Sequence, residues 1–453
     1  MLRSVTPAVY VVAALGGSCA LRADAANSGL EATQSALGAP CAAPSLGQGQ
    51  GGCAPQPEHA SIEVLFARNQ GGRPESSCDR PLCQRLVAAI AGAQSSVDFA
   101  IYGVRNQNAV IDALVEAQVR GVRVRGVVDT EGDACDHFEY EDTGLLMRRL
   151  SAGSVVCDAG TGHSYIMHDK FFVLDEASVW TGSTNISDTE LGGEYYADAA
   201  VLVESSPLAA VYTREFEEMF AGKFHKHKLD DTAHVLPPLA DGTQLESYFS
   251  PSDRTIEHAV LPLIDNAQHS LDVAMFYFTE ERIFQALKRA HARGVKLRMV
   301  LDAGGALNEF SKHRPLCELD VPVKVEHWGG KSHSKWAVAD APEDARAAVL
   351  VGSLNWTKAA NEQNDENTLV IRHNAGVAAA FASEFERQWA DLPDSLICAV
   401  VAVEGPESSD CGPDHDCVHH CVRGSCCDGI DNDHDKYIDG DDFGCRSESD
   451  TAQ

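Results

Sequence analysis

Two short motifs in the chain combine the side chains that can cleave a phosphodiester bond. His168 is followed two positions later by Lys170, and His333 is followed at the same spacing by Lys335. One imidazole can attack phosphorus and form a phosphohistidine, and a second, protonated imidazole can donate a proton to the leaving oxygen. Each lysine is a compact positive charge that suits phosphoryl oxygens. The two motifs together predict phosphoryl transfer at a shared site, with no cofactor needed for catalysis.

Both motifs continue with the same further residues. An aspartate follows each lysine after four intervening residues, at Asp175 and Asp340, and a Gly-Ser-x-Asn segment comes next. Five residues along a strand span about 17 Å, so we expect structural roles for these two aspartates. The asparagines of Gly-Ser-x-Asn can donate hydrogen bonds to transition-state oxygens. The catalytic candidates in these segments are Ser183, Asn185, Ser353 and Asn355.

The residues around each motif predict the elements that must position it. The sequences FFVL and WAVA separate each lysine from its aspartate, which indicates a buried strand. On a strand, a histidine and a lysine two positions apart project from the same face. Both side chains of each motif can therefore reach one phosphate.

The motifs lie at matching places in an internal duplication. The sequence AQSSVDFAIY, from Ala93, matches AQHSLDVAMFYF, from Ala267. An amphipathic helical pattern follows in each repeat and closes at Gly121 or Gly294 before another strand. Strand–helix–strand units of this kind imply right-handed crossovers and a parallel or mixed sheet covered by helices.

These patterns predict an α/β protein with two homologous lobes, each a mixed sheet flanked by helices. We place the repeats at residues 61–226 and 244–396, and both contain Glu-Phe-Glu in a late helix, at 215–217 and 384–386. Two motifs in one chain can complete the site without a second copy, so we expect a monomer.

A linker, KFHKHK, lies between the repeats. Its histidines, His225 and His227, could contact a metal or an anionic headgroup. Because connecting segments usually run over the surface, we expect a solvated linker.

The N-terminal segment has the features of an export signal. Arg3 precedes a short apolar run over 9–15, which is too short to span a bilayer. We expect a signal peptide over residues 1–25, or a lipoprotein signal ending at Cys19, and then a flexible linker over 26–60. Fifteen cysteines support export, because loss or lipidation of Cys19 leaves an even number for pairing. The expected location is secreted or in the cell envelope.

A Cys- and Asp-rich module is expected over residues 411–445. Four cysteines suggest disulfide staples, and oxygen-bearing residues recur at positions 1, 3, 5, 7, 9 and 12 of a calcium loop. Lys436 stands where such loops have Gly. We expect a structural calcium ion, and its predicted ligands are Asp431, Asp433, Asp435, Tyr437 through its carbonyl, Asp439 and Asp442.

At the two His-x-Lys motifs the sequence resembles the phospholipase D superfamily, also called the HKD family. The resemblance covers both repeats and implies two lobes in a pseudo-twofold arrangement, with the site where the motifs meet. It implies that His168 is the nucleophile and His333 the general acid. It also implies that a carboxylate after Gly-Ser-x-Asn orients each histidine. Glu366 matches in the second repeat, and the candidates in the first are Asp198 and, as an alternative, Glu194.

The charge of the chain favours a phospholipid over a nucleic acid. The formal net charge is -31, and 14 acidic and 3 basic residues after position 400 account for only part of it. Such a surface repels polyanions. We therefore expect hydrolysis of phospholipids at a membrane surface, giving phosphatidic acid and a headgroup alcohol.

Three alternatives remain at this stage. One is an HKD-type nuclease acting on DNA or RNA, in which Trp336 and Trp356 could stack on bases. Another is a phosphatidyl transferase similar to cardiolipin synthase, in which an alcohol replaces water. The third is an inactive binding module, which the intact His, Lys, Ser and Asn residues of both motifs disfavour.

Overall fold

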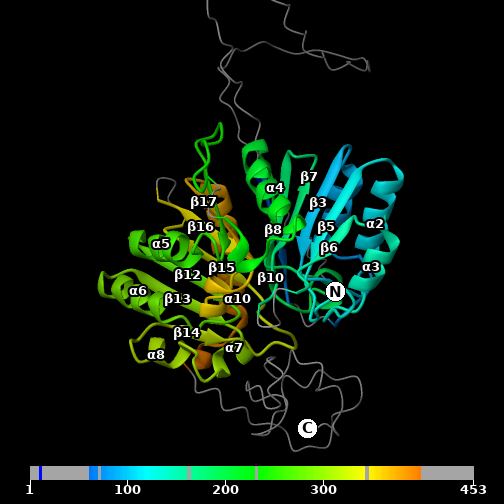
Figure 1. Ribbon diagram of the computed structural model, residues 1–453. Helices are drawn as coiled ribbons and strands as arrows, with labels where there is room; N and C mark the ends of the chain where they lie inside the picture. Colours follow the sequence, from blue (N-terminus) through cyan, green and yellow to red (C-terminus); the bar gives the residue numbers. More distant parts are fainter. Residues whose placement is uncertain are drawn as a thin grey trace, which may run out of the picture.

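The computed structural model describes residues 61–69, 73–160, 165–229, 233–341 and 346–398, and the backbone of a strand at Tyr10–Val12. Over these residues the chain forms two α/β lobes, each a mixed sheet with helices against it (Figure 1). This confirms the predicted fold class for the two repeats. The predicted tail over 411–445, with all six calcium ligands, lies outside the described residues.

The first lobe is built on an eight-stranded sheet within the described part of the chain. Its strands in spatial order are β1 (Tyr10–Val12), β2 (Ile62–Ala67), β10 (Asp198–Glu204), β8 (Ser178–Gly182), β7 (Lys170–Leu174), β3 (Ser96–Ile101), β5 (Arg123–Val128) and β6 (Val155–Cys157). A small parallel pair, β4 (Val104–Arg105) and β9 (Ile186–Ser187), lies outside that sheet.

The second lobe has the same strand arrangement in a seven-stranded sheet, again counted over the described residues. Its spatial order is β11 (Gln244–Ser250), β17 (Glu366–Arg372), β16 (Ala348–Gly352), β15 (Lys335–Ala339), β12 (Ser270–Met275), β13 (Lys296–Leu301) and β14 (Val323–Val325).

Helices join these strands in both lobes (Figure 1). In the first lobe they are α1 (Pro81–Gly92), α2 (Asn108–Val119), α3 (Thr143–Arg149), the π-helix η1 (Asp188–Gly192) and α4 (Ser206–Phe220). The 3₁₀-helix η2 (His225–His227) follows. The second lobe contains η3 (Ile256–Val260), α5 (Leu261–Asn266), α6 (Glu281–Ala292), α7 (Ala303–Leu307), α8 (His313–Cys317), α9 (Lys358–Glu362), α10 (Ala375–Asp391) and η4 (Asp394–Leu396).

Each lobe contains the crossover that the duplication predicts. Helix α2 connects the parallel strands β3 and β5, and α6 connects the parallel strands β12 and β13. Gly121 and Gly294 follow these helices with φ of +94° and +90°. A side chain adopts this conformation only with strain, so glycine ends both helices at the same point.

One buried ion pair recurs in both lobes. Arg125 donates from Nε to Asp98 at 2.8 Å, and Arg298 donates from Nε to Asp272 at 2.9 Å. Each guanidinium also reaches the last residue of the repeated Glu-Phe-Glu, at 2.7 Å in both lobes. The late helix is therefore joined to the parallel strands in the same way twice.

The two lobes share one hydrophobic core. It contains residues of both sheets together with the inner faces of α4 and α10, including Phe216, Phe381 and Trp336. Helix α4 packs against β11 of the second lobe as well as strands of its own, and α10 packs against β2 of the first lobe. The outer helices enclose a separate core in each lobe. The shared core fixes one lobe against the other.

This packing decides one expectation from the sequence. Trp336 and Trp356 are both fully buried, the first in the shared core and the second in the outer core of the second lobe. The suggestion that they could stack on bases is therefore wrong, because β15 carries Trp336 inward and the segment after β16 carries Trp356 inward. Among the described helices, none combines the length and apolar character needed to cross a bilayer.

Candidate active site

The two motifs meet where the lobes join. Lys170 opens β7 and Lys335 opens β15, and each histidine lies just before its strand. The histidine side chains keep 10% and 8% of their surface exposed, whereas the carboxylates behind them, Glu366 and Asp198, keep none. The imidazoles therefore face the open side of the site.

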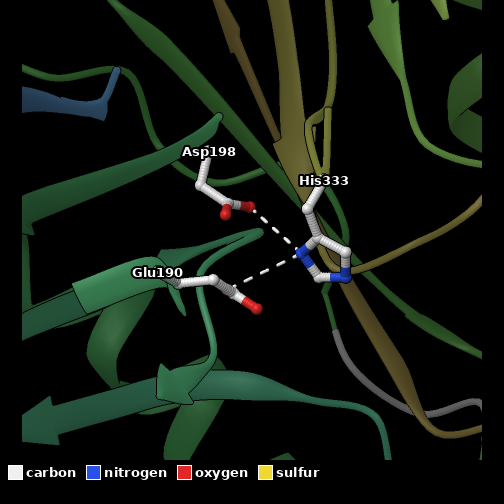
Figure 2. A group of neighbouring side chains, drawn as sticks. All are labelled: Glu190, Asp198 and His333. Atoms are coloured by element: carbon white, nitrogen blue, oxygen red, sulfur yellow. Dashed lines mark hydrogen bonds and ion pairs between the residues drawn. The ribbon is translucent and has the colours of Figure 1, made fainter. Parts of the chain in front are cut away.

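Each histidine is hydrogen-bonded to a carboxylate of the other lobe. His168 Nδ1 lies 2.8 Å from Oε2 of Glu366. His333 Nδ1 lies 3.2 Å from Oδ1 of Asp198 (Figure 2). A carboxylate at Nδ1 fixes the tautomer and direction of an imidazole, which leaves Nε2 for chemistry. The two lobes must therefore associate before either histidine is oriented.

The motif serines hold these carboxylates in place. Ser353 donates to Glu366 at 2.6 Å, and Ser183 donates to Asp198 at 2.8 Å. The preceding glycines allow this approach, because a Cβ at Gly182 or Gly352 would lie 2.1 Å from a backbone oxygen of the neighbouring strand. The serines thus act on the orienting carboxylates.

The motif lysines lie beneath the histidines. Lys170 Nζ donates to the backbone oxygen of His168 at 2.9 Å, and Lys335 Nζ donates to that of His333 at 2.8 Å. Burial lowers the pKa of Lys170 to about 8 and that of Lys335 to about 7. An anionic phosphate would favour the charged form of both lysines.

Sequence reasoning missed one carboxylate, Glu190. Its Oε2 lies 3.6 Å from Nδ1 of His333, so this imidazole faces two carboxylates (Figure 2). Asn185 donates to Glu190 from its backbone N–H and, at 2.8 Å, from Nδ2. One donor of this asparagine is therefore already used within the protein. The sequence contained a signal for a helix start here, the Ser-x-x-Glu pattern from Ser187 to Glu190.

The two histidines have opposite electrostatic surroundings. Burial, then the charges of Lys170, Lys335 and His333, lower the pKa of His168 well below its usual value. Burial and Lys335 also act against the charged form of His333, but Glu190 and Asp198 outweigh them and raise its pKa. The surroundings of the two histidines therefore shift their pKa values in opposite directions, toward the neutral form for His168 and toward the protonated form for His333.

The carboxylates beside the two histidines also differ in pKa. Burial raises the pKa of Glu366 to about 8, although Lys170 acts in the opposite direction. Burial also acts to raise the pKa of Glu190, but the charge of His333 and the donors of Asn185 hold it at about 2. Burial thus acts against an ionised Glu366 beside His168, whereas Glu190 stays ionised beside His333.

The other predicted residues lie apart from this centre. Asp175 accepts three backbone N–H bonds from the turn before β3, and Asp340 accepts the equivalent three before β12. Both cap a turn. Glu194 faces Arg80 and Arg68 instead of a catalytic histidine. The alternative orienter therefore does not reach the site.

A family profile described as "Cardiolipin synthase, PLD-like domain" matches residues 86–220 and 260–389, which is more than half of the chain. The chain belongs to the phospholipase D superfamily. The two matched segments lie one in each lobe, and each includes a complete His-x-Lys and Gly-Ser-x-Asn motif.

Relatives in the phospholipase D superfamily match part of the chain. Mitochondrial cardiolipin hydrolase of Xenopus tropicalis is 35% identical over 130 residues, which are 29% of this chain and 59% of the relative. Phospholipase D of Rickettsia conorii is 33% identical over 108 residues, which are 24% of this chain and 52% of the relative. The chain thus spans little more than half of each.

A solved structure shares the two-lobed arrangement. Phosphatidylserine synthase of Haemophilus influenzae has a TM-score of 0.55 at 13% identity, covering 73% of this chain and 87% of that one. At this identity the likeness concerns the fold alone.

The linker between the repeats of this phospholipase D family member is not solvated throughout, which corrects the expectation for His225. His227 is exposed, but His225 is 1% exposed and lies between Asp158 and Asp365, with contacts of 3.4 and 3.0 Å. Lys228 is also buried, at 2.9 Å from Asp365. The carboxylates that line the junction draw both side chains inward.

This buried linker lies directly behind the catalytic centre. Asp365 precedes Glu366, and its backbone oxygen accepts the N–H of His168 at 2.8 Å. His225 and Lys228 therefore hold the backbone segment that joins the two lobes at the site.

One group of side chains has the composition of a metal site. The ligand atoms of Glu190, Asp198 and His333 lie within 4.8 Å of one another, which is true of no other such group among the described residues. A proton on His333 accounts for the same contacts, because the ring then donates to Asp198 beside an ionised Glu190. We interpret the group as an ion pair.

Proposed function

We propose that the protein is a phospholipase D-type phosphodiesterase that hydrolyses phospholipids to phosphatidic acid and a headgroup alcohol. The observation that carries the proposal is the pair of crosswise histidine–carboxylate contacts. Their surroundings lower the pKa of His168 and raise that of His333. Metal-free cleavage of a phosphodiester requires a nucleophile and an acid in this relation.

The first step would be attack by His168. Its Nε2 forms a bond to phosphorus while the bond from phosphorus to the headgroup oxygen breaks. His333 gives its proton to that oxygen, and Lys170 and Lys335 stabilise the charge on the phosphoryl oxygens. The products of this step are a phosphohistidine and the free alcohol.

Water would complete the reaction. His333, now neutral, takes a proton from water as the water oxygen bonds to phosphorus and the nitrogen–phosphorus bond breaks. Phosphatidic acid is released, and both histidines return to their starting protonation states. An alcohol in place of water would give the transferase reaction.

Three observations support a phospholipid substrate. The chain is strongly acidic, which disfavours a polyanion such as DNA. The two tryptophans that could have stacked on bases are buried. The names of the cardiolipin hydrolase and phospholipase D relatives refer to phospholipid substrates.

Disulfides support a further part of the proposal, action in an oxidising compartment. Within the described residues, Cys78 pairs with Cys83, Cys135 with Cys157, and Cys317 with Cys398. Such bonds persist in exported proteins and are rare in the cytosol. We therefore propose that the enzyme acts at a membrane outside the cytosol.

The test uses the purified full chain in EDTA. It is incubated with vesicles of mixed phosphatidylcholine, phosphatidylethanolamine, phosphatidylglycerol and cardiolipin, and separately with single- and double-stranded DNA. We expect phosphatidic acid and free headgroup from the vesicles and no DNA fragments. DNA cleavage without lipid hydrolysis would overturn the proposal in favour of a nuclease, and added ethanol would reveal transfer as phosphatidylethanol.

A matched variant separates catalysis from contamination. His333→Ala should abolish headgroup release. His327→Ala, which alters an exposed histidine close by in the sequence, should leave it unchanged. Equal activity of wild type and His333→Ala would mean that the activity belongs to another protein in the preparation.

A further inference from the structure

The segments after the two motif asparagines match position by position. In the first lobe, the Ser187 hydroxyl accepts the N–H of Glu190 at 3.3 Å and begins η1. In the second lobe, the Thr357 hydroxyl accepts the N–H of Ala360 at 3.2 Å and begins α9. Glu190 and Ala360 each lie five residues after the motif asparagine, so they occupy equivalent positions.

The equivalent positions carry different chemistry. Glu190 directs a carboxylate at His333, whereas Ala360 has only a methyl group and packs in the outer core of the second lobe. His168 therefore faces one carboxylate and His333 faces two. This difference breaks the twofold symmetry of the site at its centre.

The π-helix that carries Glu190 is held firmly in the first lobe. Asp188 accepts from Arg105 Nε at 3.0 Å and from Asn106 Nδ2 at 2.9 Å. The backbone oxygen of Asp188 accepts the N–H of Glu75 at 3.1 Å. Arg105 lies on β4 and Asn106 follows it, so η1 is tied to the chain just before α2 as well as to the segment around residue 75.

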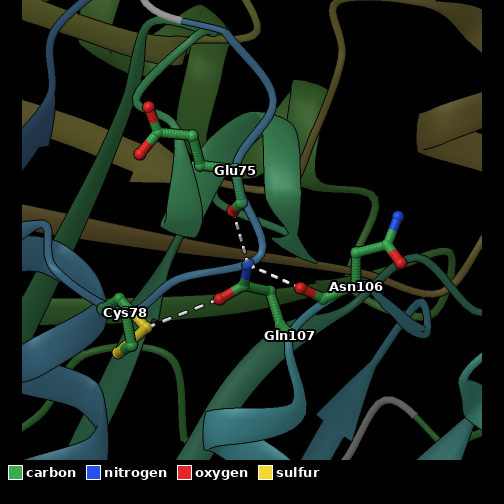
Figure 3. Close-up of a disulfide and its surroundings, with 5 residues drawn as sticks. Glu75, Cys78, Asn106 and Gln107 are labelled. Atoms are coloured by element: carbon green, nitrogen blue, oxygen red, sulfur yellow. Dashed lines mark hydrogen bonds between the residues drawn. A yellow bond between two sulfur atoms is a disulfide. The ribbon is translucent and has the colours of Figure 1, made fainter.

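A disulfide lies behind that segment. Gln107 donates from Nε2 to the backbone oxygens of Glu75 and Asn106, at 3.1 and 2.9 Å (Figure 3). Its Oε1 lies 3.5 Å from Sγ of Cys83, which is bonded to Cys78 (Figure 3). The π-helix that carries Glu190 is thus anchored within the first lobe.

We propose that Glu190 is a positioning residue that assigns the two histidines their roles. As the second carboxylate beside His333 it keeps that imidazole charged, ready to act as the general acid, and the alanine at the matching place leaves His168 as the neutral nucleophile. The inference rests on the proposed phosphodiesterase function and deepens it.

The charges around His333 come from several elements. Asp198 on β10 and Glu190 on η1 favour the protonated form of His333. Lys335, which begins β15 two residues after His333, opposes it. His333 in turn lowers the pKa of His168. Asp198 itself has a raised pKa, first because of burial and then because of Glu190, although His333 acts against both. Glu190 is thus the more readily ionised of the two carboxylates, and its removal should be felt most at His333.

The first test measures protonation without any substrate. Imidazole nitrogen resonances of histidine-labelled wild type, Glu190→Gln and Glu190→Ala are titrated, and the His333 signals are assigned by their loss in His333→Gln. We expect the pKa of His333 to fall by about one unit or more in both Glu190 variants. Because Glu190→Ala copies the residue of the second lobe, a folded Ala variant remains informative if the Gln variant does not fold.

The second test uses the leaving group. A phosphodiester that releases an alkyl alcohol needs His333 to protonate the leaving oxygen. A phosphodiester that releases p-nitrophenolate needs this proton much less, because p-nitrophenolate is a good leaving group. At a pH above the His333 pKa of both proteins, as the titration locates it, Glu190→Gln should slow the alkyl substrate about tenfold or more and have little effect on the nitrophenyl substrate. At a pH below the His333 pKa of both proteins, the difference between the two substrates should disappear.

Controls separate this inference from its alternatives. Glu204→Gln, at the exposed end of β10, should leave both substrates and the His333 titration unchanged. An equal loss with both substrates at every pH, or an unshifted His333 titration, would overturn the role of Glu190. A His333 titration that changes on addition of EDTA would show a bound cation in place of the proton and would also overturn it. If wild type cleaves neither substrate, the proposed function fails, and the titration still tests Glu190.

Discussion

Glu366 of the second lobe and His168 of the first, 198 positions apart in the chain, are joined by a hydrogen bond of 2.8 Å between Oε2 and Nδ1. The same relation holds in the opposite sense between Asp198 and His333 at 3.2 Å. Neither lobe therefore contains both members of a histidine–carboxylate pair. The site forms only when the shared core brings the two lobes together.

Glu366→Gln should reduce kcat by about 10² to 10⁴-fold, within the usual range for loss of proton-transfer catalysis. The neutral Gln amide cannot ionise to offset the positive charge that develops on the His168 ring as Nε2 bonds to phosphorus. Ser353→Ala, which keeps the Glu366 carboxylate but loses the 2.6 Å bond to it and the 3.0 Å bond from the Asn367 N–H, should have a smaller effect. Steady-state rates on a soluble phosphodiester would measure kcat for both variants. An unchanged kcat for Glu366→Gln would contradict the proposal that Glu366 orients His168.

The two histidines should differ when the leaving group is good. His168→Ala should lose all covalent labelling by a p-nitrophenyl phosphodiester, because no nucleophile remains. His333→Ala should still form some phosphohistidine, since p-nitrophenolate leaves without an acid. Mass spectrometry of peptides from the labelled protein, digested without exposure to acid, would locate the phosphoryl group. Labelling of His333 in the His168→Ala protein would reverse the assignment.

The pH dependence should reveal the buried lysines. Burial places the pKa of Lys335 at about 7 and that of Lys170 at about 8, so both lose their charge as the pH rises through this range in the free enzyme. We expect kcat/KM to fall between pH 7 and 9. Bound phosphate favours the charged lysines, so the decline in kcat should begin at higher pH. Coincident declines in the two profiles would argue against these lysines as the titrating groups.

His225 should stabilise the fold most at low pH. Burial acts against its charge, but Asp158 and Asp365 raise its pKa from 6.5 to about 9, which corresponds to about 3 kcal/mol. This contribution is complete below pH 6.5, where the unfolded histidine is also protonated, and is lost as the pH rises through 9. Denaturant unfolding should therefore show a cost for His225→Gln that shrinks between pH 6.5 and 9. The exposed His227→Gln is the control.

Lys228→Met should destabilise the protein by about 3 to 5 kcal/mol, because it leaves buried carboxylates without their cation. Lys228 Nζ contacts Glu215 and lies 2.9 Å from Asp365. Lys226→Met, two positions earlier and exposed, should change the unfolding free energy little. Equal unfolding free energies for the two variants would show that the buried lysine contributes nothing net.

Local patterns in the sequence were sufficient for the fold class and for much of the site. The alternation of side chains along a strand predicts that His168 and Lys170 face one way, and the structure starts β7 at that lysine. The helix period and its closing glycine predicted α2 and α6, each between parallel strands. These features depend on residues a few positions apart, so the chain itself encodes them.

The sequence named Glu366 and Asp198 as orienting carboxylates. Only the tertiary structure decided that each serves the histidine of the other lobe, that His225 is buried and that Glu190 lies beside His333. Each depends on a contact between segments whose distance in space has no counterpart in the spacing of the sequence. The sequence by itself determined two copies of one catalytic unit. The packing of α4 and α10 between the sheets determined that each copy completes the other, because a buried imidazole takes its charge state from whichever carboxylates surround it.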